Sequence, residues 1–519
     1  MTFKKIAFIS FIVISLLGVF FRFYHITENQ FIYYDEGMWL NQDRSFVTLV
    51  ANNPPKNFSE LTKILGISAK LSLFTAKSLW TFLSHLRALT VGAEGWYFTR
   101  LISAIFGTLT LGITYLFARR YYDSRRVGLL ALTLLAILPS HIYYSRLGLQ
   151  EAFSTFCFTA GLYLYLFPHK IRWQTFFSAF LFSLVFFSNY RMIIIPALVG
   201  VCQLLISIGS KEKFPIQKYV VNTLTFLVII FGVGALHEGA NTQITFSWMF
   251  RQAGLAKGDF QLLNIFAYPY YLFRLESIFF GFLFFGNIYL CIQRQWHKIM
   301  PFALSCFMMA LFSLSQEQGV RYLCAMMPLM VMAVAGLIIH LYENNKNLIF
   351  QCSVMAVTIL MFSIQLFKSN EIIHFSSDYE PAMQMLLDEN KNVKVLSTQH
   401  MIQKLYTSNE KNVAAAPHDM KYLFAYYSKG YRYLIIDPQA YISYTADNKH
   451  FTLQLKNYLE LVTQKIQPIK EYAHFSPALL ERFVLEHNDD LRKSLDFLKV
   501  NKDGRLGRLR VYDLGHIFK

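Results

Sequence analysis

Two adjacent carboxylates, Asp35 and Glu36, stand among aromatic and apolar residues in the segment FIYYDEGMW. Charged side chains are seldom found in such surroundings unless they are paired or used in chemistry. A carboxylate held close to a hydroxyl group can accept its proton and act as a general base. Asp35 and Glu36 are therefore the first candidates for a catalytic site.

Arginines recur at the same end of the expected membrane helices as these two carboxylates. They are Arg22, which ends the first apolar stretch, and Arg100, Arg146, Arg191 and Arg321. A guanidinium group can grip a phosphate with two parallel hydrogen bonds. For any one of them the alternative is an arginine that reaches toward lipid headgroups. Together with a carboxylate, the set indicates transfer of a group from a lipid phosphate to a hydroxyl, which needs no nucleotide.

The composition indicates a membrane protein. Of the 519 residues, 54% are hydrophobic and only 16% are charged, whereas a soluble domain has about a quarter charged. The net charge of +17 fits basic cytoplasmic loops better than nucleic-acid binding, for which no motif is present. The six cysteines show no C-x-x-C spacing, so a zinc or disulfide framework is not expected. His141 and Glu151 alone are too few ligands for a metal site, although the sequence leaves a need for a divalent metal open.

Apolar runs of spanning length predict eleven transmembrane helices. They lie near 1–23, 97–118, 127–144, 149–167, 173–189, 191–209, 219–236, 275–293, 299–315, 320–341 and 348–367. The stretch 61–86 is interpreted as a helix on the membrane surface instead. Its Lys63, Lys70 and Lys77 recur every seven residues and would share one wet face.

Lysines and arginines are concentrated in alternate loops, which predicts a cytoplasmic N-terminus in the plasma (inner) membrane. The loop 24–96, the loop 237–274 and the tail from about 370 are then extracytoplasmic. We expect a transmembrane domain over 1–370. Strand-like segments at 393–398 and 431–437, among helical patterns at 380–389 and 400–406, predict a small α/β domain over 371–519.

Three segments resemble one family. RFYHITENQFIYYDEGMW resembles the Arg…Asp-Glu opening of the polyprenyl-phosphate-sugar glycosyltransferases of the C superfamily, known as GT-C. This group includes protein O-mannosyltransferases (the dolichyl-phosphate-mannose-protein mannosyltransferase family) and the aminoarabinose transferase of lipid A. The stretch from Thr99 to Phe156 resembles the next part, where an arginine opens a span and an S-R pair precedes an acidic residue. VRYLCAMMPLM resembles the late R-Y-x-x-x-x-x-P element.

The resemblance implies a GT-C-like fold and a role for each matching residue. Asp35 would be the catalytic acid/base residue, supported by Glu36, and Glu151 and Tyr322 would assist. Arg22, Arg100, Arg146 and Arg321 would build the donor and phosphate site; Arg191 joins them on the physical argument alone. The partners would be a polyprenyl-phosphate-linked sugar, a hydroxyl-bearing acceptor and membrane lipids, and the reaction would invert the anomeric centre. The loop 237–274 is too short for the β-trefoil insert of eukaryotic O-mannosyltransferases.

Two other functions remain open from the sequence. A glycan polymerase or ligase with a lipid-diphosphate donor would share the outer arginines but should not need the Asp35–Glu36 pair. A non-enzymatic transporter of lipid-linked sugars would spread its charges through the depth of the membrane. The charges here gather at one face, which favours an enzyme.

Overall fold

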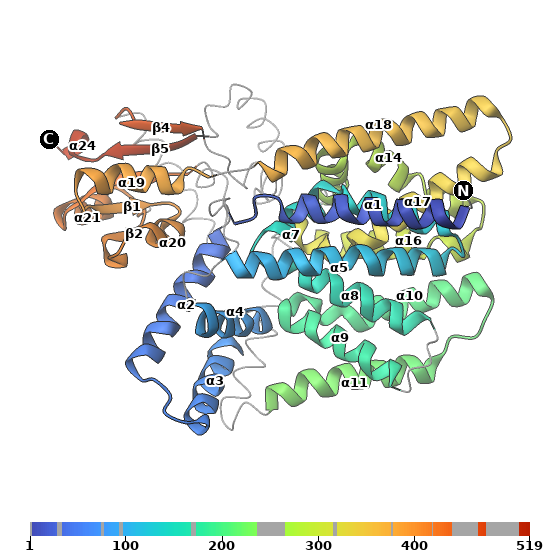
Figure 1. The fold of residues 1–519 in the computed structure, drawn as a ribbon, viewed down its shortest axis with the longest axis horizontal. Coiled ribbons are helices and arrows are strands. Elements are labelled where there is room, and N and C mark those ends of the chain that lie inside the picture. The colour runs from blue at the N-terminus through green and yellow to red at the C-terminus, as the bar shows by residue number, and fades with distance from the viewer. Residues whose placement is uncertain are drawn as a thin grey trace.

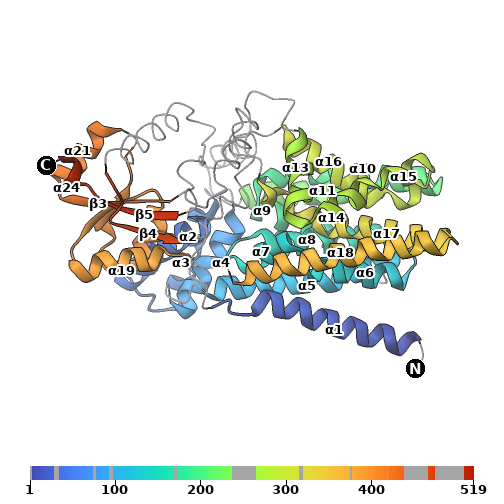
Figure 2. The same cartoon turned by 90° about the horizontal axis from the view of Figure 1, so that it is seen from above.

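The computed structural model describes residues 3–27, 34–73, 77–92, 97–167, 173–235, 265–314, 319–374, 377–417, 419–437, 466–473 and 508–518. Long helices form one part of the molecule and a small sheet with its own helices forms the other (Figure 1). Turned by 90°, the sheet still lies beyond the end of the long helices that is remote from the N-terminus (Figure 2). Most of the predicted loop 237–274 lies outside the described residues.

The helical part follows the chain order of the predicted spans. Its helices are α1 (Phe3–Phe23), α5 (Tyr97–Tyr121), α6 (Arg125–Ala136), α7 (Pro139–Arg146), α8 (Glu151–Leu166), α9 (Gln174–Ser188), α10 (Ile195–Ser210), α11 (Ile216–Ala235), α13 (Ala267–Tyr271), α14 (Ile278–Phe285), α15 (Ile288–Ile292), α16 (Met300–Ser313), α17 (Met327–Asn344) and α18 (Leu348–Ile373). Short 3-10 turns precede α10 (Tyr190–Ile194) and α17 (Val320–Met326), and a π-helix (Leu272–Glu276) precedes α14.

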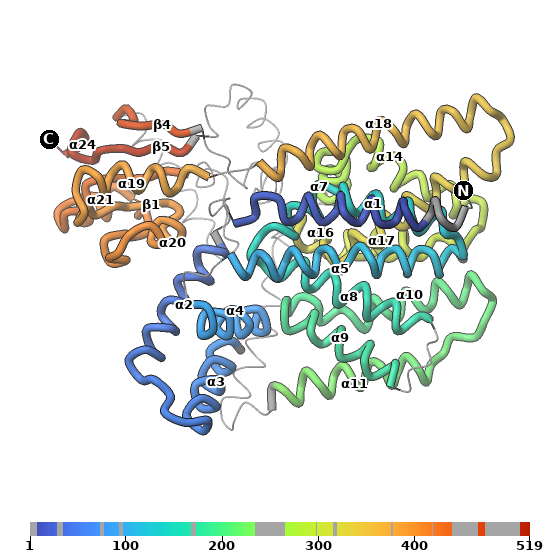
Figure 3. The backbone as a smooth tube through the Cα atoms, in the orientation of Figure 1, coloured from blue at the N-terminus to red at the C-terminus, as the bar shows by residue number. Residues whose placement is uncertain are grey.

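Among the described residues, five helices are long and apolar enough to cross a membrane, or six if a bent pair counts as one span. Others, such as α9 and α16, are apolar but shorter. A helical membrane protein is therefore established, whereas the predicted count of eleven spans is not. The backbone tube shows that α17 lies within the bundle of long helices (Figure 3). In the segment Val320–Asn344, which contains α17, 94% of the most apolar stretch is buried inside the protein.

The predicted span 127–144 is not one straight helix. It is divided into α6 and α7, which are bent by 57° relative to each other. Pro139 is the first residue of α7 and Leu138 before it is extended. A proline has no N–H to donate and its ring displaces the preceding turn, so the helix must end and restart there. The break leaves the carbonyls at the end of α6 without helical partners.

Three helices, which we call the outer helices, lie at the end of this bundle that is remote from the N-terminus (Figure 1): α2 (Tyr34–Asn52), α3 (Phe58–Leu73) and α4 (Ser78–Val91). The single helix predicted over 61–86 is divided in the structure, because α3 ends at Leu73 and α4 begins at Ser78. The two helices contact each other, with Ser68 Oγ 2.8 Å from His85 Nδ1. Their place on the membrane surface stays a prediction. Lys63 and Lys70 are exposed on α3 as expected. Lys77 precedes α4 and does not share their face.

The small sheet has five strands in the order β2-β1-β3-β5-β4. The strands are β1 (Lys394–Ser397), β2 (Val413–Ala415), β3 (Tyr431–Ile436), β4 (Lys470–Ala473) and β5 (Arg508–Asp513), with helices α19 (Tyr379–Glu389), α20 (His400–Gln403), α21 (Met420–Ser428) and α24 (Gly515–Phe518). β1 pairs in parallel with β2 and β3, and β5 pairs antiparallel with β3 and β4.

Both faces of this sheet are covered. Val395 and Ile435 belong to one buried cluster and Leu396 and Leu434 to another, so successive residues point to opposite apolar layers. This explains why the central strands read as continuous apolar runs. Leu40 of α2 belongs to the first cluster, and the outer helices are thereby packed into the core of the sheet domain.

Candidate functional site

Asp35 lies in the first turn of α2, and its Oδ2 accepts two charged hydrogen bonds. Lys77 Nζ lies 2.7 Å from this oxygen, and Arg321 Nη1, from the 3-10 turn before α17, lies 3.0 Å away. The three side chains, which we call the Asp35 cluster, are 15–17% exposed. A ligand can therefore reach the cluster.

Tyr322 brings a second arginine to this cluster. The guanidinium carbon of Arg191 lies 4.2 Å from the centre of the Tyr322 ring, and that of Arg321 lies 5.3 Å from it. Arg321 Nη2 also lies 3.4 Å from the Tyr322 hydroxyl. A cation over an aromatic face is attracted by the negative charge of the ring face. Tyr322 thus contacts two guanidinium groups, and one of them, that of Arg321, also contacts Asp35.

Glu36 is directed away from this cluster, into a buried ion pair with Arg100. Arg100 Nε and Nη2 donate to the two carboxylate oxygens at 2.8 and 2.9 Å, which is a forked contact. The backbone N–H of Gly148 donates to the same carboxylate at 2.7 Å. The side chains of Glu36 and Arg100 are only 3% and 2% exposed. This pair fixes the start of α2 against α5 and the turn before α8.

Glu151 faces the Asp35 cluster from the first turn of α8. Its Oε1 accepts a hydrogen bond of 2.9 Å from Gln150 Nε2. Its Oε2 is buried and makes no hydrogen bond within the described part of the chain. The carboxyl group interacts electrostatically with Lys77, Arg321 and Asp35. It can therefore receive a hydrogen-bond donor from a ligand at the cluster.

Arg22 is buried at the break between α6 and α7. It donates to the carbonyl oxygens of Gly18 at 2.8 Å and of Leu135 at 3.1 Å, and Nη2 lies 2.6 Å from His141 Nδ1. Carbonyls at a helix C-terminus have no partner within the helix, and a guanidinium group satisfies them well. These contacts make Arg22 a support of the broken helix, so we leave it out of the proposed phosphate site.

Arg146 supports two other helix ends in the same way. Its Nη1 donates to the carbonyl oxygens of Phe21 at 3.1 Å and Tyr24 at 2.8 Å, at the end of α1. Its Nη2 donates to the carbonyl of Ile373 at 3.3 Å, at the end of α18. The guanidinium group is committed to the backbone, so Arg146 also stays outside the proposed phosphate site, as does the paired Arg100.

Lys77 is the residue that the sequence reasoning missed. Its spacing from Lys63 and Lys70 suggested one exposed stripe, but α3 ends at Leu73 and α4 begins at Ser78. Lys77 Nζ also lies 5.5 Å from the centre of the Trp39 ring. Nothing in the local sequence distinguishes Lys77 from the other two lysines. Its position follows only from how the α3–α4 pair packs against α2.

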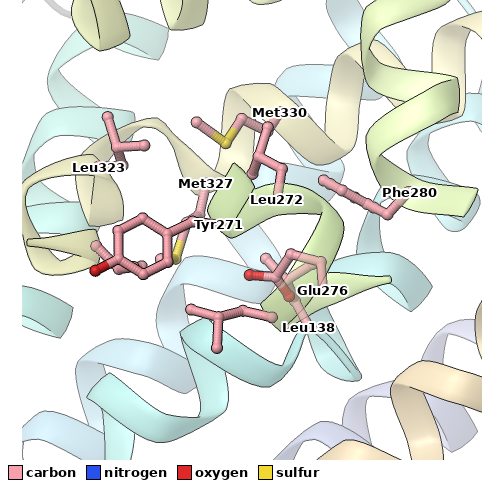
Figure 4. Close-up of a pocket in the computed structure, with 10 residues that line it drawn as sticks. Leu138, Tyr271, Leu272, Glu276, Phe280, Leu323, Met327 and Met330 are labelled. Atoms are coloured by element: carbon pink, nitrogen blue, oxygen red, sulfur yellow. The ribbon is translucent and has the colours of Figure 1, made fainter. Parts of the chain in front are cut away.

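No group of three or more His, Cys, Asp or Glu side chains is placed to hold a metal ion among the residues that the structure describes. One small pocket lies deeper in the bundle, between α7, the π-helix and α17 (Figure 4). Its lining is mostly apolar and includes Leu138, Tyr271 and Glu276. Ser140 donates to the carboxylate of Glu276. The pocket includes no member of the Asp35 cluster.

The sequence is similar to one family of known proteins over part of its length. Residues 12–237 match the family model described as dolichyl-phosphate-mannose-protein mannosyltransferase. No curated protein matches the whole sequence significantly.

Two kinds of solved structure have a similar fold. The apo oligosaccharyltransferase of Archaeoglobus fulgidus is 10% identical with a TM-score of 0.57, over 90% of this chain and 73% of that one. Apo ArnT from Cupriavidus metallidurans is 11% identical with a TM-score of 0.53, over 85% and 94%. ArnT bound to undecaprenyl phosphate is 12% identical with a TM-score of 0.50, over 83% and 93%. The predicted resemblance to this family of glycosyltransferases is therefore confirmed over residues 12–237, and the fold is similar to that of these solved structures.

Proposed function

Because residues 12–237 carry a domain of the dolichyl-phosphate-mannose-protein mannosyltransferase family, we propose that this glycosyltransferase moves a sugar from a polyprenyl phosphate to a hydroxyl acceptor. The reaction takes place at the outer face of the membrane and inverts the anomeric centre. The observation that carries the proposal is the single carboxylate oxygen of Asp35 that Lys77 and Arg321 share at 2.7 and 3.0 Å.

Lys77 and Arg321 bind the donor phosphate in this proposal, with Arg191 beside them. Arginine and lysine are the side chains best suited to phosphate oxygens. The three cations exceed the charges of Asp35 and Glu151 by one, so the site can hold an added anion. That ArnT has been solved with undecaprenyl phosphate supports a lipid phosphate as the natural ligand.

Lys77 and Arg321 also control whether Asp35 can act as a base. In the structure they neutralise its Oδ2, and a carboxylate engaged by two cations is a weak proton acceptor. A donor phosphate competes for both cations and frees this oxygen for the acceptor hydroxyl. We infer that the donor must bind first.

The chemical step is a single displacement. Asp35 takes the proton of the acceptor hydroxyl while the oxygen of that hydroxyl attacks the anomeric carbon. The bond from that carbon to the phosphate oxygen breaks, and the electron pair leaves with the polyprenyl phosphate. Lys77 and Arg321 stabilise the charge that develops on this leaving group. Glu36 does not touch the reacting atoms and acts through Arg100 by fixing the first turn of α2.

The direct test supplies purified protein in lipid vesicles with a polyprenyl-phosphate sugar and an extract of envelope glycans. Sugar transfer with release of polyprenyl phosphate is expected. The matched arm replaces the donor by a polyprenyl-diphosphate sugar, and should give no transfer. Transfer from the diphosphate donor alone would favour a glycan polymerase or ligase and overturn the proposal. Consumption of neither donor, with movement of lipid-linked sugar between leaflets, would favour a transporter.

A further inference from the structure

Helix α2, whose first turn carries Asp35 and Glu36, packs against the sheet domain. Within two turns, Gly37, Asn41 and Arg44 of α2 contact the segment 401–405, which follows β1. The two hydrogen-bonded pairs, Asn41 with Met401 and Arg44 with Leu405, are 360 and 361 positions apart in the sequence. We call this set of contacts the α2–α20 clamp.

Gly37 lets the two segments approach closely. A Cβ atom at this position would lie 2.9 Å from Ile402 Cγ1 and 3.1 Å from both Cα and N of Ile402. The contact to Cγ1 is shorter than real Cβ contacts, and the two contacts to the backbone are tighter than most of them. A side chain at position 37 must therefore shift the Ile402 side chain and move its backbone away by a few tenths of an ångström.

Asn41 and Arg44 hold the segments together. Asn41 Nδ2 donates to the carbonyl of Met401 at 2.6 Å and to that of Gly37 at 2.8 Å. Arg44 Nη2 donates to the carbonyl of Leu405 at 3.2 Å. Leu40, next to Asn41, is 4% exposed and packs in a core cluster of the sheet domain. The contact thus combines hydrogen bonds with apolar burial, and it lies two residues from Asp35.

Two other contacts fix α2 from different sides. Glu36 is paired with Arg100 of α5 at 2.8 Å, and Asp43 is paired with Arg87 and Ser84 of α4. Helix α2 is therefore the element at which the membrane helices, the outer helices and the sheet domain meet.

We propose that the sheet domain is a positioning element for catalysis, and that Gly37, Asn41 and Ile402 are positioning residues that set the place of Asp35 between Lys77 and Arg321. This inference rests on the proposed function, because it assigns the clamp a role in sugar transfer. It predicts that loosening the clamp lowers turnover while the donor site, built by Lys77 and Arg321, still binds lipid phosphate. A misplacement of about 1 Å in a catalytic group can cost about 10²-fold in rate.

The test compares Gly37→Ala with Gly66→Ala. Gly66 is a helical glycine on α3, and an added Cβ atom there would meet no atom of a neighbouring segment within 4 Å. Gly37→Ala should lower kcat several-fold, less than the about 10²-fold of a 1 Å misplacement, with little change in the affinity for undecaprenyl phosphate. Gly66→Ala should change neither. Adding Ile402→Ala removes the Cγ1 contact and should restore part of the turnover. Asn41→Asp, which keeps the size but loses both donated hydrogen bonds, should lower kcat in the same way.

Two outcomes overturn the clamp. One is parental turnover in both Gly37→Ala and Asn41→Asp. The other is a loss of turnover in Gly37→Ala that is not restored by adding Ile402→Ala and is matched by an equal loss of affinity for undecaprenyl phosphate.

Hydrogen exchange gives a reading independent of activity. Amides of residues 37–44 and 401–405 should exchange faster in Gly37→Ala than in the parent, and unchanged exchange would contradict the proposal. If the parent transfers no sugar, the proposed function fails, and the exchange data still decide whether the clamp exists.

Discussion

Arg321 and Asp35 are 286 residues apart in the sequence, yet Arg321 Nη1 lies 3.0 Å from Asp35 Oδ2. The late R-Y element and the early Asp-Glu element of the chain therefore form one site. Lys77 contacts the same oxygen at 2.7 Å. In the resting protein the proposed base and the proposed phosphate ligands neutralise each other, which keeps a charged cluster stable at the end of the long helices that is remote from the N-terminus.

The first prediction concerns Lys77. If Lys77 binds the donor phosphate, Lys77→Ala should raise the KM for the polyprenyl-phosphate sugar by about 10- to 100-fold, the value of a charged hydrogen bond. Arg321→Ala should act similarly, and Arg321→Lys should recover only part, because an ammonium group cannot make a forked contact. Lys63→Ala, an exposed residue of α3, is the control. Unchanged donor kinetics in both alanine variants would remove these cations from the phosphate site.

A second prediction separates the structural arginines from the functional ones. Arg146→Ala leaves the carbonyls of Phe21, Tyr24 and Ile373 without their donor, and unsatisfied buried groups cost about 1–3 kcal/mol each. We therefore expect a clear fall in the unfolding temperature. The fraction that remains folded should keep its donor KM. A large rise in donor KM with parental thermal stability would return Arg146 to the phosphate site.

The third prediction concerns pH and the outer helices. Burial raises the pKa of Asp43 to about 6 from 3.8, against the effect of Arg87. Burial, with Arg87 as the second cause, lowers the pKa of His85 to about 4 from 6.5. As the pH falls from 6.5 to 4, His85 binds a proton in the unfolded chain before it does so in the folded chain, which destabilises the fold. Over nearly the same range the folded chain protonates Asp43 first, which stabilises it.

These two effects oppose each other, so removing one should expose the other. Between pH 6.5 and 4, the unfolding temperature of Asp43→Asn should fall more steeply than that of the parent as the pH is lowered. That of His85→Gln should fall less steeply or rise. The quantity to compare is the change of unfolding temperature with pH, because each substitution also changes stability by an amount that does not depend on pH. Identical slopes in all three proteins would contradict the assignment.

The fourth prediction tests the orientation in the membrane. A cysteine in place of the exposed Ser428, on α21, should react with an impermeant thiol reagent applied from outside intact cells. A cysteine in place of the exposed Lys346, between α17 and α18, should react only after the membrane is opened. The parent, whose own cysteines include the exposed Cys352, gives the background. The reverse pattern would place the Asp35 cluster on the cytoplasmic side.

Much of this organisation was predictable from the sequence because it depends on local patterns. Apolar length and periodicity located the membrane helices to within a few residues, and β1 and β3 fall inside the predicted segments 393–398 and 431–437. Asp35 and Arg321 were predictable because ionisable residues are conspicuous among apolar ones. The bend at Pro139 could have been read from the proline itself.

The partners of the charged residues were not predictable, because they depend on long-range packing. Arg22, Arg146 and Arg321 have similar surroundings in the sequence, yet the first two bind helix-end carbonyls and only the third meets Asp35. Lys77 and Lys70 differ in role because a helix ends between them. The approach of Ile402 to Gly37 joins distant segments, and no local pattern indicates it.

The central claim is that Asp35 takes the proton of the acceptor hydroxyl. The most direct measurement is the single-turnover rate of sugar transfer by Asp35→Asn at saturating donor, counted per donor-competent protein and compared with Glu36→Gln. Asparagine keeps the size of aspartate but has no useful basicity, so the rate should fall by about 10²–10⁴-fold, with binding of the polyprenyl-phosphate sugar retained. Glu36→Gln should lose less, because it weakens only the contact to Arg100. An Asp35→Asn protein that transfers sugar at the parental rate would contradict the account.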